Sequence, residues 1–145
     1  MTFRNRFLFI AFIIVSILGL IQQWRIHNKT IEDYDAPKIL SGKKEMIDLR
    51  HIQRKCDCAD WIPADRYKDS ANLKEEDYLF IEPATKDLDV PASYWALADS
   101  GYVLRLHGEF YKGKAIPYNY IQKTDNKPVL ASVFYYTSCE VVKPE

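Results

Sequence analysis

The stretch Tyr102–Tyr111 reads YVLRLHGEFY, and its pattern decides the fold. Tyr102, Leu104, Leu106 and Phe110 share one row, and the charged or imidazole side chains of Arg105, His107 and Glu109 stand in the other. A period of two is that of a β-strand with one face in a core and the other in water. Gly108 interrupts the apolar row, and a glycine inside a strand marks a bulge or a sharp bend of a barrel. The stretch therefore predicts one strand of a curved sheet.

Three other segments carry strand patterns. Met46–Arg54 places two aliphatic residues two apart, Tyr78–Glu82 is a short apolar run stopped by Pro83, and Leu130–Val142 is long and aromatic. Along this last segment, unbroken alternation would place the odd-numbered residues on one face and the even-numbered residues on the other. These segments predict further strands on both sides of the first one.

The remaining segments are interrupted or polar. Ile116–Gln122 is a weaker strand candidate, because Pro117 lacks an amide hydrogen. Cys56–Asp77 has the composition of a loop, and Ala92–Ala98 predicts two helical turns with Gly101 just beyond them. The expected fold is mainly β: a small antiparallel barrel or curled sheet with one short helix. A Greek-key barrel of the oligonucleotide/oligosaccharide-binding (OB) type is the first choice, and an open α+β sheet is the alternative.

An apolar run precedes this domain. Phe7–Trp24 contains no charged side chain and follows Arg4 and Arg6. As a helix it would extend about 27 Å, close to the hydrocarbon thickness of a bilayer. We therefore predict an N-terminal membrane anchor over residues 1–24 that is not cleaved. A cleaved signal peptide and a buried soluble helix are the alternatives.

The anchor implies a three-part organisation. Residues 25–45 are polar and mixed in charge, which indicates a tether, and residues 46–145 form the small β domain. An apolar first segment behind a short basic start leaves its N-terminus in the cytoplasm. The β domain is therefore expected outside the cytoplasm, in the cell envelope.

The charge balance bears on the class of partner. The chain has 20 basic and 20 acidic residues and no long basic block. A domain that binds phosphates carries a positive bias, so nucleic acid is not the expected partner. We expect contact with the membrane through residues 7–24 and with a protein or glycan through the β domain.

The chain contains three cysteines, Cys56, Cys58 and Cys139. In an oxidising compartment two of them are expected to pair, and the expected disulfide joins Cys139 to either member of the close pair. The alternatives are reduced thiols, a redox site, or a metal site completed by His51 or His107. The C-x-C spacing matches structural zinc poorly, so no metal and no cofactor are predicted.

The polar face of Tyr102–Tyr111 supplies the candidate ligand-binding residues Arg105, His107 and Glu109, with Tyr111 at its end. A histidine between opposite charges has the chemistry of a general base, but no nucleophile motif accompanies it. No catalytic residue is therefore predicted, and a solvated sheet face is the alternative interpretation. Similarly, five tyrosines either line a groove that stacks on sugars or bases or fill the core: Tyr111, Tyr118, Tyr120, Tyr135 and Tyr136.

Four segments in order carry a family resemblance: CDCADW at 56–61, LFIEPA at 79–84, RLHGEFY at 105–111 and VFYYTSCEV at 133–141. Together they resemble an uncharacterised group of small bacterial envelope proteins and lipoproteins, over roughly residues 54–142. The chain lacks the cysteine to which lipoproteins of that group attach lipid, in keeping with a helical anchor. The resemblance implies an envelope location and a small β domain, and it transfers no catalytic residue.

Taken together, these patterns predict a non-enzymatic, membrane-anchored envelope protein whose β domain is a binding module. One alternative is an OB-like domain that binds oligosaccharide or nucleic acid. The other is a redox or metal protein that uses the three cysteines.

Overall fold

The computed structural model describes residues 16, 17, 19 and 38–144. Residues 16, 17 and 19 are helical. The rest of the predicted anchor, and the predicted tether up to residue 37, lie outside the described residues. Among the described residues, no helix combines the length and the apolar character needed to cross a bilayer. The contacts below all belong to the unit Pro37–Glu145.

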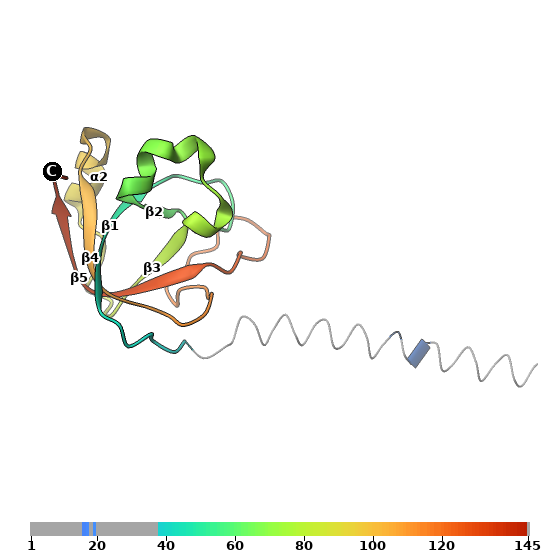
Figure 1. Ribbon diagram of the computed structural model, residues 1–145. Helices are drawn as coiled ribbons and strands as arrows, with labels where there is room; N and C mark the ends of the chain where they lie inside the picture. Colours follow the sequence, from blue (N-terminus) through green and yellow to red (C-terminus); the bar gives the residue numbers. More distant parts are fainter. Residues whose placement is uncertain (1–15, 18, 20–37, 145) are drawn as a thin grey trace, which may run out of the picture. The chain divides into compact units, whose positions relative to one another are not determined.

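This unit is a β-barrel. Its elements are β1 (Glu45–His51), β2 (Trp61–Pro63), η1 (Ala64–Asn72), η2 (Glu75–Asp77), β3 (Leu79–Pro83), α2 (Ala92–Leu97), η3 (Ala98–Ser100), β4 (Val103–Phe110) and β5 (Ser132–Val142). The strands follow the order β1-β2-β3-β5-β4, and β4 pairs with β1 to close the ring (Figure 1). The predicted mainly β domain with one short helix is confirmed, and the alternative of an open sheet is wrong.

One pairing differs from the expected antiparallel arrangement. β3 and β5 run parallel, whereas the other neighbouring pairs are antiparallel. After β3 the chain passes through α2 and enters β4, which pairs with β1 rather than with β3. β5 then fills the place between β4 and β3, and its antiparallel pairing with β4 makes it parallel to β3. A parallel neighbour requires such a long connection.

Gly108 marks a β-bulge, as predicted. The register between β4 and β5 shifts between His107 and Gly108, so that Thr137 is the extra residue on β5. This extra residue shifts the alternation of the strand, and Cys139 joins the core side on which Tyr136 already lies. The expected unbroken alternation of β5 is therefore wrong. Figure 1 shows the bend of β5 near its middle.

Two segments differ from the structure expected for them. The segment Cys56–Asp77 contains the three-residue strand β2 and two 3-10 helices, although its composition predicts a loop. Ile116–Gln122 contains no strand; the nearest pairing is an isolated bridge between Ala115 and Ala131. The predicted helix forms as α2, and Gly101 ends the following η3 turn with a φ of 88°. A positive φ costs glycine little, which explains its place there.

Two buried clusters lie on opposite faces of β3. Inside the barrel, Leu79 belongs to a cluster that includes residues of each of the other four strands and Tyr94 of α2. On the outer face, Phe80 packs with Val133 and with side chains of the segment that connects β4 to β5. Because both faces of β3 are covered, its sequence is a continuous apolar run rather than an alternating one.

Candidate binding groove

A groove of about 390 Å³ lies where the loop between β1 and β2 (residues 52–60, the β1–β2 loop) approaches the loop between β4 and β5 (residues 111–131, the β4–β5 loop). The barrel strands β1, β2, β3 and β5 contribute to its lining, as does the segment between β3 and α2, and α2 contributes one side chain. The side chains used in the argument below are His51, Asp60, Trp61, Trp95, Tyr120, Ile121 and Lys123. The groove therefore brings together side chains that are distant in the sequence.

Aromatic rings form one wall of the groove. His51 lies opposite Trp61 in the β1–β2 pairing, and the two ring centroids are 5.1 Å apart. The rings of Trp95 and His51 pack edge-on with their centroids 5.2 Å apart. Trp95 remains 51% exposed. Successive residues of a helix point in different directions, so burial of Tyr94 in the core directs Trp95 outward. Ile121 of the β4–β5 loop also lines the groove and is 83% exposed.

An ionic cluster lies beside the aromatic wall. The carboxylate of Asp60 accepts a hydrogen bond from Lys123 Nζ at 2.8 Å and lies 3.2 Å from His51 Nε2. Burial by itself would raise the pKa of Asp60, but the hydrogen bonds and charges of His51 and Lys123 outweigh it and lower the pKa. Asp60 is therefore an anion at neutral pH that links β2 to the β4–β5 loop.

A second carboxylate, that of Asp57, also holds the β4–β5 loop. Asp57 is 3% exposed, and its carboxylate accepts hydrogen bonds from Tyr120 Oη at 2.8 Å, from the amide of Lys123 at 2.6 Å, and from the amide and hydroxyl of Thr124. The backbone oxygen of Asp57 accepts the amide of Val129 at 2.6 Å. Burial would raise the pKa of Asp57, but these donors outweigh it and lower the pKa to about 2.

The lowered pKa of Asp57 predicts sensitivity to acid. A carboxylate whose folded pKa lies below its ordinary 3.8 stabilises the fold above that pH, and the contribution is lost as the pH falls towards 2. We expect the urea midpoint to fall more steeply between about pH 5 and about pH 2.5 in the natural chain than in Asp57→Asn. Parallel pH profiles of the two chains would contradict this assignment.

A third carboxylate, Glu82 at the end of β3, holds the other part of the loop. It is 4% exposed and accepts hydrogen bonds from Tyr111 Oη at 2.8 Å, from the amide of Tyr118 at 2.9 Å and from Lys38 Nζ at 3.2 Å. Lys38 also lies 3.3 Å from the centroid of the Tyr118 ring, and Ile39 O accepts the amide of Lys112. The end of the sequence assigned to the tether thus contacts the barrel.

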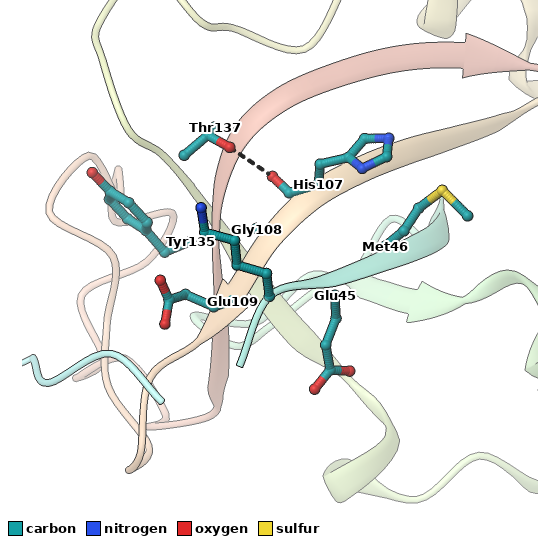
Figure 2. A pocket seen from close by; sticks show the side chains of 8 residues that line it. Glu45, Met46, His107, Gly108, Glu109, Tyr135 and Thr137 are labelled. Atoms are coloured by element: carbon teal, nitrogen blue, oxygen red, sulfur yellow. Dashed lines mark hydrogen bonds between the residues drawn. The ribbon is translucent and has the colours of Figure 1, made fainter. Parts of the chain in front are cut away.

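The structure separates the polar row predicted from the sequence. His107 and Glu109 both line a smaller pocket of about 320 Å³, but Figure 2 shows their side chains pointing in different directions. Thr137 donates a hydrogen bond to the backbone oxygen of His107, and Glu109 accepts the amide of Gly42 at 2.7 Å. The pocket lies at the bulge at Gly108, and the Glu109 carboxylate in it already accepts the amide of Gly42.

The other two members of the row lie elsewhere. Arg105 forms a two-pronged ion pair with Asp48 on β1, with distances of 2.7 and 2.8 Å, beside a larger cavity of about 890 Å³ between β1 and η1. Tyr111 donates to the buried Glu82, and burial followed by this hydrogen bond raises its pKa. Arg105 and Tyr111 therefore join parts of the fold, and neither lines the groove.

The five tyrosines also have separate positions. Tyr136 lies in the core with 1% exposure and donates to Leu88 O, whereas Tyr118 is 82% exposed. Tyr111 and Tyr135 are tilted neighbours with centroids 6.1 Å apart, away from the groove. Of the five, Tyr120 and Tyr136 line the groove, and the ring of Tyr120 packs edge-on against Phe80.

The cysteines pair differently from the expectation. Cys56 and Cys58 form a disulfide across Asp57, with their Cα atoms 5.3 Å apart, and Cys139 is a free thiol. The expected bridge to Cys139 is wrong because β5 places this residue opposite Leu106, where its sulfur lies 3.6 Å from Asp89 O. Within residues 38–144, no three His, Cys, Asp or Glu side chains are grouped to hold a metal ion.

The residues of the groove were largely missed by sequence reasoning. From the sequence, His51 is a candidate only as a metal ligand beside the cysteines, and no pattern points to Asp60 or Lys123. One feature of the sequence does point to Trp95: it follows Tyr94 directly on a short helix, and such a helix cannot bury two neighbouring rings on one face. Comparison of the chain with protein-family models, curated proteins and solved structures finds no match.

Proposed function

We propose that this chain is a membrane-anchored protein of the cell envelope whose β domain binds a ligand in the groove without catalysing a reaction. One observation carries the binding role: a half-exposed indole, Trp95, faces a groove that also holds the Asp60–Lys123–His51 cluster. Ligand sites combine apolar surface with a few convergent polar groups in this way. Aromatic side chains at such positions supply much of the binding energy.

The chemical groups in the described lining of the groove suit binding. No serine, threonine or cysteine side chain lines the groove in the described part of the chain. The carboxylate of Asp60 and the ammonium of Lys123 already neutralise one another at 2.8 Å. Such a cluster suits hydrogen bonding to a polar ligand. The envelope address rests on the apolar segment 7–24 and on the resemblance of residues 54–142.

A more specific version of this proposal is favoured by the barrel itself. A five-stranded Greek-key barrel that binds ligands between its β1–β2 and β4–β5 loops is the architecture of OB domains. The groove lies between these same two loops. We therefore favour an oligosaccharide over a nucleic acid as ligand, because the chain is balanced in charge and the ionic cluster includes a carboxylate.

The test uses Trp95→Ala and intrinsic tryptophan fluorescence. Soluble envelope oligosaccharides and single-stranded oligonucleotides are titrated separately into the full-length chain. We expect an oligosaccharide to bind and Trp95→Ala to weaken its affinity by about tenfold or more. The control is Ile39→Ala, which removes a 55% exposed side chain outside the groove.

Two outcomes would contradict the proposal. Binding of an oligosaccharide that is equal in Trp95→Ala and in the natural chain would remove the groove from the function. Binding of the oligonucleotides alone would show that the ligand is a nucleic acid and not an oligosaccharide. The address is tested separately by cell fractionation, and recovery of the full-length chain with the soluble cytosolic proteins would contradict it.

A further inference from the structure

The disulfide lies in the loop that holds the groove. Cys56 and Cys58 are two residues apart in the β1–β2 loop, and the ring that they close contains Asp57. Cys58 is 2% exposed, whereas Cys56 is only partly buried. Closing such a small ring restricts the backbone of its middle residue. The position of the Asp57 carboxylate is therefore constrained by the bond between its two neighbours.

The partners of Asp57 all belong to one segment on the other side of the groove. Tyr120, Lys123 and Thr124 donate to its carboxylate, and Val129 donates to its backbone oxygen. Residues 112–130 contain no strand or helix, so side-chain contacts must supply much of the order of this segment. Within residues 120–129, four residues donate to Asp57, whereas the amide of Tyr118 donates to Glu82.

We infer that the Cys56–Cys58 disulfide is a thiol-sensitive switch that controls the order of residues 120–129. With the bond formed, Asp57 is held in position to accept its hydrogen bonds. With the bond broken, the backbone of residue 57 regains freedom, and ordering its carboxylate against the loop becomes less favourable. The consequence for ligand binding rests on the proposed function, because Tyr120, Ile121 and Lys123 line the groove.

The chemical step is thiol–disulfide exchange with a dithiol. A thiolate of the dithiol attacks Cys56 Sγ, the more accessible sulfur, and the bond between Cys56 and Cys58 breaks. Cys58 leaves as a thiolate and takes up a proton. The second thiol of the reductant then attacks the mixed disulfide and releases Cys56 as a thiol. Two electrons and two protons pass to the chain, and the dithiol becomes a cyclic disulfide.

The free thiol must be removed before the switch is tested. Cys139 lies on β5, where its Sγ is 3.6 Å from Asp89 O, so the background variant Cys139→Ser changes no residue of the β1–β2 loop. In this background, any disulfide of the chain involves Cys56 and Cys58 alone.

The experiment measures amide hydrogen exchange of the full-length Cys139→Ser chain in mild detergent, with and without dithiothreitol. Peptide mapping first establishes the bond between Cys56 and Cys58. We expect the amides of Lys123, Thr124 and Val129 to exchange about tenfold faster after reduction. The amide of Tyr118 and the amides of β4 and β5 should keep their rates, which provides a control within the same molecule.

Two variants separate the parts of the switch. Cys56→Ser removes the more accessible sulfur and leaves the buried Cys58 in place, and we expect fast exchange of residues 120–129 with or without reductant. Asp57→Asn keeps the disulfide but weakens the acceptor, and we expect fast exchange in both states as well. Neither measurement requires a ligand, so the switch can fail while the binding proposal stands.

Three results would overturn the inference. The first is equal exchange of residues 120–129 before and after reduction. The second is a natural chain, prepared without reductant, in which Cys56 and Cys58 are both free thiols. The third is loss of protection throughout β4 and β5 on reduction, because the switch would then act on the whole fold rather than on the loop.

Discussion

Replacing Gly108 by alanine is expected to destabilise the barrel by about 3 kcal/mol, because a side chain there meets backbone and not a flexible side chain. A Cβ at this position would overlap the carbonyl oxygen of Tyr135 and lie 2.8 Å from the Cα of Tyr136. Relief would require β4 and β5 to separate at the bulge. Urea denaturation monitored by circular dichroism measures the loss in free energy of unfolding.

Gly113→Ala is the matched control for this substitution. Gly113 lies just after β4 in the sequence, and a Cβ there would have no neighbour within 4 Å. We expect its free energy of unfolding to stay within about 0.5 kcal/mol of that of the natural chain. Equal stabilities of the two variants would show that the close approach of β5 to Gly108 is not needed for the fold.

The second large effect is expected at Glu82. Glu82→Ala should cost about 3–5 kcal/mol, because it leaves the ammonium of Lys38 and the hydroxyl of Tyr111 without their acceptor in a buried site. The side chains of Lys38 and Glu82 are 9% and 5% exposed. Thermal and urea unfolding both measure this loss.

Two further variants test the cause. Glu76→Gln removes a carboxylate that lies 4.0 Å from Lys74 in an exposed pair, and we expect a change below about 0.5 kcal/mol. In the second, Lys38→Met is added to Glu82→Leu, which removes both buried charges and should recover part of the lost stability. If this double variant is no more stable than Glu82→Leu alone, the buried charge of Lys38 is not the source of the loss.

The strands that the sequence predicted share one property. β4 alternates in sequence from Leu104 onwards, and β3 is an apolar run bounded by Pro83, so each carries its own signal. β2 is only three residues long, which is too short to show a period. The parallel pairing of β3 with β5 could not be predicted, because it depends on where β4 pairs and not on either strand's own residues.

The groove was harder to predict, because tertiary contacts create it. Asp57 stands in a charged loop, where a carboxylate is normally solvated, and its donors lie 63 to 67 residues further along the chain. The bulge at Thr137 likewise belongs to a pair of strands, although Gly108 gave its approximate place. The pairing of the cysteines depended on the position of Cys139 in β5, which the sequence pattern did not specify.

The two pairings of β5 have a consequence for folding during biosynthesis. This last strand pairs with both β3 and β4, so the ring cannot close before residues 132–142 have been made. Until then, the edges of β3 and β4 that pair with β5 carry unpaired backbone groups. If the chain is exported as proposed, the domain would cross the membrane unfolded and complete its fold on the far side, which suits passage through a narrow translocation channel.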